Sequence, residues 1–351
     1  MERQLTPVQL ISSGRRWSVS SEAAEILRAH SGKLAVCSIT GLFSSGKSSL
    51  ANDLFKTPSP FPVGHESDPC TSGLWFIIVS GQSLGIHESA DFDVLVIDSE
   101  GLQSFHEDPN FHHKMFQLLL LGSSTMLYND REEISEESIS DLSVLLPINN
   151  KNGKSKQNGN SQYGLDSASA PFWIWTLRDV SSRSSLGDVG DSALSHMEEM
   201  LSPKEEVHPA VKETNHIRSI IRETFKERDC FLLPTHRLRD EYLRSVDKLR
   251  AHLVSSLRIK KIGEYEMTGP ILLSLFSQAT FLLNKKQSPY LLIHSFRPSI
   301  PADMSDSEDD RTEDDRDTEK ASRGGTHTLH ELMVRFFCLG RCFPPDPSAA
   351  F

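Results

Sequence analysis

The sequence predicts an α/β fold with a doubly wound, mostly parallel sheet that carries helices on both faces. Short apolar runs rich in β-branched and aromatic residues recur through the first two thirds of the chain, and they alternate with longer segments of helical character. One of these runs leads directly into a loop of glycine, serine and lysine that opens a helix. With 351 residues, the chain is long enough for one large domain and a smaller attachment.

The predicted strands follow one another along the chain, without any internal repeat. They are LAVCSI (34–39), LWFIIV (74–79), FDVLVI (92–97), TMLY (125–128), FWIWTL (172–177) and CFLL (230–233). We expect the α/β domain to cover residues 31–257, after an N-terminal extension over 1–30. A polar segment, 146–168, reads as a solvated loop before the fifth of these runs.

The remainder of the chain predicts a short helical segment and a tail. Apolar residues at helical spacing predict a helix from about Thr268 through Leu282, so residues 258–290 form the predicted start of a second, helical domain. Residues 291–351 are the predicted low-complexity acidic tail and C-terminal segment. Within it, 305–325 holds a dense acidic run, which favours a disordered linker over an interaction tail and predicts that its deletion leaves ligand affinity unchanged. A short amphipathic helix can follow at 329–343.

Composition excludes several classes of protein. The formal net charge of −11 argues against a nucleic-acid binder and against recruitment to membranes by charge. The 5 cysteines, at positions 37, 70, 230, 338 and 342, have neither disulfide-framework nor zinc-ligand spacing, which favours a reducing compartment. We find no secretory signal, no apolar stretch of roughly 20 residues and no prenylation box. These features predict a soluble cytoplasmic protein without a transmembrane segment, with peripheral membrane association left open.

The loop GLFSSGKSSL matches the pattern Gly, four residues, Gly, Lys and Ser. Glycines let successive backbone amides point inward, the lysine ammonium reaches the β- and γ-phosphates, and the serine hydroxyl binds Mg²⁺. A Gly/Ser-rich turn can match by chance, but here a strand precedes the loop and a helix follows it. The positive N-terminal end of that helix favours the binding of an anion. The loop therefore predicts a triphosphate cradle and a P-loop NTPase fold, formed by Gly41, Ser44, Ser45, Gly46, Lys47, Ser48 and Ser49.

Two further positions fit a magnesium and γ-phosphate site. Asp98 ends an apolar strand and Gly101 follows, so the carboxylate can hold Mg²⁺ through a water and the glycine amide can approach the γ-phosphate. A strand-ending turn explains this short pattern equally well on its own. Thr71 lies in the polar stretch between the two motifs, where it is either a switch threonine that binds Mg²⁺ or an ordinary loop residue.

The aromatic strand FWIWTLRD ends in Arg178 and Asp179. A carboxylate there can accept hydrogen bonds from the ring N–H and the exocyclic amine of guanine, whereas adenine would leave it unpaired at a cost of roughly 1–3 kcal/mol. A solvated Arg–Asp pair is the alternative in the absence of the other motifs. Together with them, the pair favours guanine over adenine.

Six stretches together resemble the guanylate-binding protein and atlastin group of large, dynamin-like GTPases: GLFSSGKSSL, PCTSGLW, VLVIDSEGL, LLLLGSSTMLYND, FWIWTLRDV and IRSIIRETFKERDCFLLP. The resemblance runs from about Lys33 to about Leu283. It implies a GTPase domain that dimerises head to head across its nucleotide sites and continues into a helical stalk. It also implies that Gly46, Lys47, Ser48 and Ser49 bind phosphate and Mg²⁺, that Thr71 is the switch threonine, that Asp98 and Gly101 form the second switch, and that Arg178 and Asp179 read guanine.

Two departures from the group concern hydrolysis. Members commonly place an arginine finger where this chain has Ser44, and animal guanylate-binding proteins place a serine where it has Pro69. The leading hypothesis is a GTP hydrolase with GTP or GDP and Mg²⁺ as ligands, a homodimer partner and an unknown protein partner. Its candidate catalytic residues are Lys47, Ser48, Thr71 and Ser44, and its candidate metal ligands are Ser48, Thr71 and Asp98.

The alternatives are a nucleotide-dependent binding module with weak or no hydrolysis, and an ATP-using P-loop enzyme. Because a serine cannot supply the charge of an arginine finger, we expect tight GTP binding but weak hydrolysis, unless a basic residue such as Arg178, Arg183 or a partner's side chain enters the site. Replacing Ser44 with Arg is then expected to raise turnover.

Overall fold

The computed structural model describes residues 6–13, 16–56, 61–63, 73–86, 91–102, 110–145, 169–180 and 191–299. All of them belong to one compact unit, Met1–Ala302. Thr71, Pro69, Arg183, the polar segment 146–168, the acidic run 305–325 and the expected helix at 329–343 lie outside the described residues.

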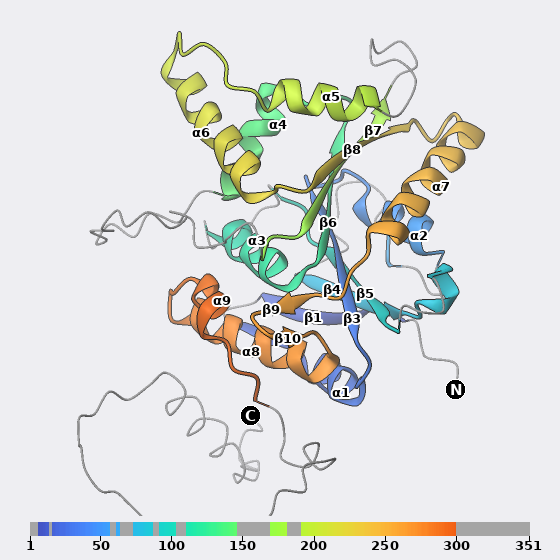
Figure 1. Cartoon of the computed structure of the whole chain (residues 1–351), viewed down its shortest axis with the longest axis vertical. Coiled ribbons are helices and arrows are strands. Elements are labelled where there is room, and N and C mark those ends of the chain that lie inside the picture. Colours follow the sequence, from blue (N-terminus) through green and yellow to red (C-terminus); the bar gives the residue numbers. More distant parts are fainter. Residues whose placement is uncertain are drawn as a thin grey trace, which may run out of the picture. The chain divides into compact units, whose positions relative to one another are not determined.

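A sheet of 8 strands forms the centre of this unit, in the order β2-β1-β4-β5-β3-β6-β7-β8 (Figure 1). Its strands are β1 (Val8–Ser13), β2 (Trp17–Val19), β3 (Leu34–Gly41), β4 (Leu74–Val79), β5 (Asp93–Ser99), β6 (Thr125–Arg131), β7 (Phe172–Val180) and β8 (Arg228–Pro234). The runs β5-β3-β6-β7-β8 are parallel, whereas β4 is antiparallel to both of its neighbours. The predicted mostly parallel sheet is therefore confirmed, and all the runs predicted as strands lie in it.

Helices cover both faces of the sheet. They are α1 (Ser21–Ala29), α2 (Lys47–Phe55), α3 (Phe111–Gly122), α4 (Glu136–Asp141), α5 (Asp191–Met200), α6 (Pro209–Thr224), α7 (Arg239–Ser256), α8 (Gly269–Asn284) and α9 (Leu292–Ser295). A small second sheet pairs β9 (Lys261–Ile262) with β10 (Tyr265–Glu266), and 3-10 turns lie at Gln82–Leu84, Leu142–Leu145 and Pro289–Leu291.

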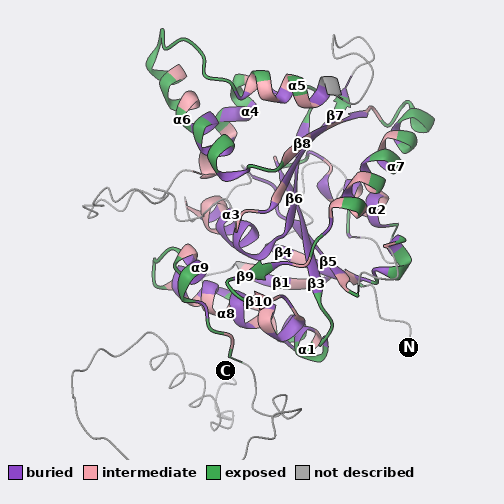
Figure 2. Cartoon of the chain, in the orientation of Figure 1, coloured by how far each residue is buried: buried purple, intermediate pink, exposed green. Residues whose placement is uncertain are grey.

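Two apolar clusters, one on each face, make up the core. The first joins α2 and α7 to alternate residues of the central strands, such as Cys37 and Val96. The second joins α1, α3, α5, α6 and α8 to the intervening strand residues, such as Val36 and Ile97. Because successive strand side chains point to opposite faces, a strand covered on both sides must be apolar throughout, and β3 is buried along its whole length (Figure 2).

The N-terminal segment contributes more to the sheet than the sequence predicted. Residues expected to form an extension make a helix and two strands at one side of the sheet, with β1 paired to β4 and β2, the edge strand, paired to β1. Their apolar runs are short, so the alternation that marks a strand is weak, and pairing within the sheet decides their conformation.

The helix predicted from about Thr268 is α8, which begins at Gly269 with Thr268 as its N-cap residue. It packs against α1 and α3. At its end, the Asn284 side chain accepts a hydrogen bond from the Trp17 N–H at 3.0 Å and donates one to the Trp17 carbonyl at 2.8 Å. Thus α8 is fastened to the edge of the large sheet; the domain boundaries inferred from sequence stay predictions.

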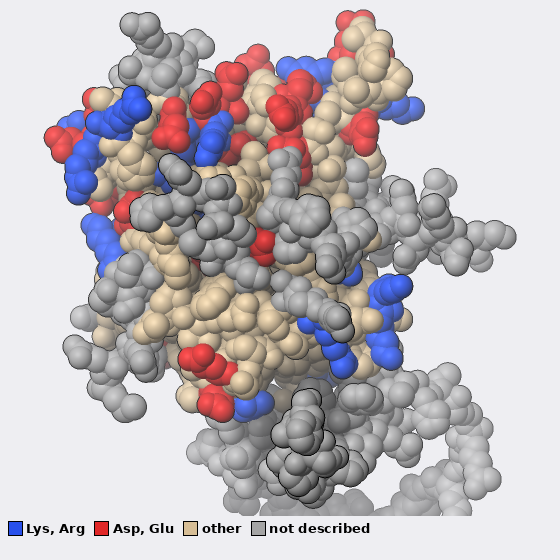
Figure 3. Space-filling view, turned by 180° about the vertical axis from the view of Figure 1, so that it is seen from behind, with Lys and Arg blue, Asp and Glu red and all other residues tan. Residues whose placement is uncertain are grey.

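Charged side chains of both signs are interspersed over the upper part of the molecule in the view from behind (Figure 3). Among the described residues, no helix is long and apolar enough to cross a membrane.

Candidate functional site

The predicted phosphate loop lies between β3 and α2, at the carboxyl edge of the parallel strands. Gly41 ends the strand, and the helix begins at Lys47, as the sequence predicted. Gly46 has a left-handed backbone with φ 80°, and a Cβ there would lie 2.3 Å from Nη1 of Arg178. Glycine suits this position, because the left-handed dihedral angle strains other residues and a Cβ would displace the Arg178 guanidinium.

Lys47 is buried at the mouth of this loop, with 6% of its surface exposed. Its Nζ donates a hydrogen bond to the Leu42 carbonyl at 2.7 Å, inside the curl of the loop. Burial lowers the pKa of Lys47 to about 8, although Asp98 and Glu100 act in the opposite direction. A bound anion would offset the cost of burying this cation, so the site favours a negatively charged ligand.

Ser48 and Asp98 meet beside Lys47. The Ser48 hydroxyl donates to Oδ2 of Asp98 at 2.7 Å, from the first turn of α2 to the end of β5. Asp98 is fully buried. Hydroxyl and carboxylate oxygens are the ligands that Mg²⁺ prefers, so this donor set fits the metal. Ser49, the next helical residue, is partly buried.

The segment that follows β5 is in direct backbone contact with the phosphate loop. A Cβ on Gly101 would lie 2.4 Å from the Cα of Phe43. The Leu102 N–H donates to the Gly41 carbonyl at 2.9 Å, and the Phe43 N–H donates to the Leu102 carbonyl at 2.8 Å. The position predicted as the second switch thus lies against the loop that it would sense.

Glu100 extends this contact towards the segment that contains Thr71. Its carboxylate accepts the Gly73 N–H at 2.9 Å, and its own N–H donates to the Gly73 carbonyl at 2.9 Å. Thr71 itself lies outside the described residues. Glu100 was not among the predicted site residues, because an exposed turn after a strand explains a glutamate equally well.

Asn129 supports the loop from the neighbouring strand β6. Its side-chain amide donates to the Ser45 carbonyl at 2.7 Å and to the Ser45 hydroxyl at 3.1 Å. The Thr176 hydroxyl on β7 donates to the other side of this amide, at 3.1 Å from Oδ1. Sequence reasoning missed Asn129; the available signal was an asparagine directly after the apolar run of a strand.

Arg178 and Asp179 have different environments. Arg178 is almost fully buried, and its Nη1 donates to the Gly46 carbonyl at 2.6 Å. Its other terminal nitrogen contacts the His236 ring, and the guanidinium lies 5.6 Å from the centre of the Tyr242 ring. Asp179 is exposed, with a left-handed backbone of φ 60°. Arg178 therefore braces the phosphate loop, while Asp179 is the member of the pair that is open to a ligand.

The rings of His236 and Tyr242 both contact the Arg178 guanidinium and also pack against each other. The centres of the His236 and Tyr242 rings lie 3.9 Å apart, and the Tyr242 hydroxyl donates to Oδ2 of Asp53 on α2 at 2.7 Å. Burial, followed by the charge of Arg178, lowers the pKa of His236. A neutral imidazole can accept a hydrogen bond from the guanidinium, so α2, β7 and α7 are joined at one point.

Arg131 is a second arginine beside the loop, and it was not among the residues predicted from the sequence. It is the last residue of β6, and its Nη2 donates to the carbonyl of Ser44. Ser44 is exposed and has a left-handed backbone with φ 57°. A guanidinium thus lies at the loop position where the sequence lacks an arginine.

The cysteines of the described residues take no part in this site. Cys37 and Cys230 are free and buried, and burial raises the pKa of both thiols, that of Cys230 to about 12. Within the described part of the chain, no group of three or more His, Cys, Asp or Glu side chains could hold a metal ion.

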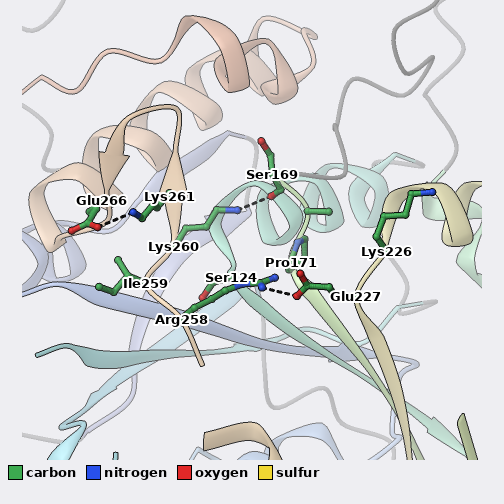
Figure 4. Close-up of a pocket in the computed structure, with 11 residues that line it drawn as sticks. Ser124, Ser169, Pro171, Lys226, Glu227, Arg258, Ile259, Lys260, Lys261 and Glu266 are labelled. Carbon is green, nitrogen blue, oxygen red and sulfur yellow. Dashed lines mark hydrogen bonds and ion pairs between the residues drawn. The ribbon is translucent and has the colours of Figure 1, made fainter. Parts of the chain in front are cut away.

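A separate pocket of about 510 Å³ opens at the opposite, amino-terminal edge of the parallel strands (Figure 4). Three of the four cations that line it contact partners within the chain: Lys260 donates to the Ser169 carbonyl at 2.9 Å, Arg258 to Glu227 at 2.5 Å, and Lys261 pairs with Glu266 at 2.9 Å. The first two contacts join the segment before β9 to the residues that precede β7 and β8. These three side chains therefore have a structural role in the pocket.

The fold and the loop together define a P-loop NTPase. A family model described as "Guanylate-binding protein, N-terminal domain" matches residues 15–266, most of the chain. The chain therefore belongs to the guanylate-binding protein family, which confirms the resemblance drawn from its motifs.

Curated relatives agree with this assignment. Guanylate-binding protein 2 of Homo sapiens is 26% identical over 291 residues, which cover 77% of this chain and 48% of the relative. Guanylate-binding protein 1 of Chlorocebus aethiops is 28% identical over 292 residues, with the same coverage of 77% and 48%. The chain thus spans about half the length of these relatives.

Among solved structures, one similar chain is the translation elongation factor SelB from Methanococcus maripaludis, in complex with the GTP analogue GppNHp. The alignment covers 66% of this chain and 36% of the SelB chain. The TM-score is 0.31 and the identity is 12%, a similarity too low to bear on fold or function.

Proposed function

We propose that the chain binds GTP together with Mg²⁺ and hydrolyses it to GDP and inorganic phosphate. The observation that carries this proposal is the meeting of Lys47, Ser48 and Asp98 at the mouth of the phosphate loop, with the Ser48 hydroxyl 2.7 Å from the Asp98 carboxylate. The carbonyls of Ser45 and Gly46 in the same loop accept hydrogen bonds from the side chains of Asn129 and Arg178. Pre-organised donors of this kind act on charge that develops in the transition state.

In the proposed reaction, the oxygen of a water molecule attacks the γ-phosphorus, and the bond between that phosphorus and the β–γ bridging oxygen breaks. The proton of the water goes to the phosphate product. Lys47 and the loop amides bind the β- and γ-phosphates. Ser48 and Asp98, with Thr71, would hold Mg²⁺, which neutralises phosphate charge when bound.

Guanine selection is assigned to Asp179. This carboxylate is exposed, at the carboxyl end of β7 beside the phosphate loop, where a base would extend beyond the phosphates. Titration of labelled GTP and ATP tests the assignment, with Asp179→Asn as the variant. We expect clear preference for GTP that Asp179→Asn abolishes. Equal affinities of the unmodified protein for GTP and ATP would contradict it.

A homodimer formed across the nucleotide sites is part of the proposal, because the resemblance to the guanylate-binding protein and atlastin group implies a GTPase domain that dimerises head to head. Phosphate release measured over a range of protein concentrations tests it. A specific rate that rises with concentration supports the dimer; a constant specific rate contradicts it.

The second candidate function is a nucleotide-dependent binding module that turns over slowly or not at all. Ser44, in the place of an arginine finger, favours it. Tight GTP binding with no phosphate release at any protein concentration would decide for this candidate.

A further inference from the structure

Ser44 leaves the apex of the phosphate loop without a cationic side chain of its own, but a cation from another element is present there. The guanidinium of Arg131 donates a hydrogen bond to the Ser44 carbonyl. The two residues are 87 positions apart in sequence, and the sheet brings them together because β6 pairs with β3 as far as Asn129 and Gly41.

The backbone of Arg131 is held in place on both sides. Its N–H donates to Oδ1 of Asp130 at 2.8 Å, and its carbonyl accepts the Glu133 N–H at 2.7 Å. Asp130 is buried and also accepts a hydrogen bond from Nε1 of Trp175 at 3.3 Å. The side chain of Arg131 itself is exposed. A long flexible side chain therefore projects from a rigid base beside the loop.

Arg131 and Lys47 contact the same loop. The Lys47 ammonium donates to the Leu42 carbonyl and the Arg131 guanidinium to the Ser44 carbonyl, two residues further along. Two cations thus share the mouth of one loop, from two different elements. Like charges held this way repel one another until an anion lies between them, so the pair is suited to a polyphosphate.

We propose that Arg131 acts in cis as the arginine finger of this chain, in place of the missing arginine at position 44. This inference rests on the proposed GTP hydrolysis. The guanidinium exchanges the Ser44 carbonyl for oxygens of the transferring phosphoryl group, where it neutralises charge that appears as the bond to the bridging oxygen breaks. Arg131 forms no covalent bond and transfers no proton; the water's proton still goes to phosphate.

The test compares Arg131→Ala with Arg28→Ala, a matched control in which an exposed arginine is removed from α1, remote in the fold from the loop. We expect Arg131→Ala to slow single-turnover GTP hydrolysis by about 10³-fold. GTP and GDP affinities should change by less than about threefold, and Arg28→Ala should leave all these values unchanged.

A second readout separates catalysis from support of the loop. GDP with aluminium fluoride imitates the transferring phosphoryl group, so a finger contributes to its binding but not to that of GDP alone. We expect Arg131→Ala to lose aluminium-fluoride-dependent binding and the double variant Ser44→Arg/Arg131→Ala to regain both this binding and hydrolysis. Equal weakening of GTP, GDP and the fluoride complex would instead show that Arg131 only supports the loop, and would overturn the inference.

The remaining outcomes distinguish failure of this inference from failure of the proposed function. If the unmodified protein hydrolyses GTP and Arg131→Ala does so at the same rate, the inference is wrong while the proposed function stands. If the unmodified protein binds GTP but never hydrolyses it, Arg131 is no finger and the binding module remains. If it binds no guanine nucleotide, the proposed function itself fails.

Discussion

The side-chain amide of Asn129 spans the gap between β6 and the phosphate loop, donating to the Ser45 carbonyl at 2.7 Å and to the Ser45 hydroxyl at 3.1 Å. Both residues are buried. A buried carbonyl that loses its donor costs roughly 1–3 kcal/mol, so this one side chain has a large share in fixing the loop.

Asn129→Ala is therefore expected to weaken GTP binding by about tenfold, which corresponds to about 1.4 kcal/mol. Titration with a fluorescent GTP analogue measures it. Asn284→Ala is the control, since Asn284 also makes two amide hydrogen bonds to one backbone residue, but at α8. It should lower stability and leave GTP affinity unchanged. Unaltered GTP binding by Asn129→Ala would show that the loop holds its shape without this support.

Gly46→Ala should abolish nucleotide binding. The new Cβ would meet the Arg178 guanidinium at 2.3 Å, on a backbone with φ 80°. Gly85→Ala separates the two causes, because Gly85 has nearly the same φ, 74°, but nothing within 4 Å of its Cβ. The control should lose about 1–2 kcal/mol of stability from the dihedral angle alone and bind GTP normally. Chemical denaturation and nucleotide titration measure both effects; similar behaviour of the two variants would contradict the role of the close contact.

GTP affinity should fall as pH rises above about 8. Lys47 has a pKa of about 8 in the free protein because it is buried, and phosphate binds its charged form. The complex then binds more protons than the free protein above this pH, so affinity decreases with pH, by up to about tenfold per unit. Calorimetric titrations from about pH 7 to about pH 9.5 measure the slope.

Lys47→Arg provides the control for this pH dependence, because a guanidinium stays charged throughout the range. Its affinity at pH 7 is expected to be lower, since the loop fits an ammonium, but its profile should be flat. A flat profile for the unmodified protein would mean that Lys47 does not titrate in this range.

Arg218→Met should lower the stability of the domain by about 2–4 kcal/mol. Arg218 is fully buried on α6, and it donates to the Met200 carbonyl at 2.9 Å and contacts the Glu136 carboxylate. Arg222→Met, one turn further along the same helix and exposed, should change stability by less than about 0.5 kcal/mol. Denaturant unfolding measures both. Equal stabilities of the two variants would show that the buried contacts of Arg218 contribute little.

Local patterns in the sequence determined most of the fold. Runs such as 34–39 and 172–177 are apolar because the strands they form are covered on both faces, so their position could be predicted from composition alone. The phosphate loop could be predicted for the same reason, since its glycines, lysine and serine meet local demands of backbone and ligand. The start of α2 at Lys47 and of α8 after Thr268 follow from these local signals.

Only the tertiary structure decided which side chains support that loop. Asn129, Arg131 and Arg178 lie far from it in sequence, and they reach Ser45, Ser44 and Gly46 because β6 and β7 follow β3 in the order of the sheet. Strand order depends on how long-range pairings compete, which no local pattern encodes. The same holds for β1 and β2, whose short runs become strands through pairing at the edge. Residue types and their spacing therefore determined where a triphosphate would be held, and the packing of the sheet decided which cations face it.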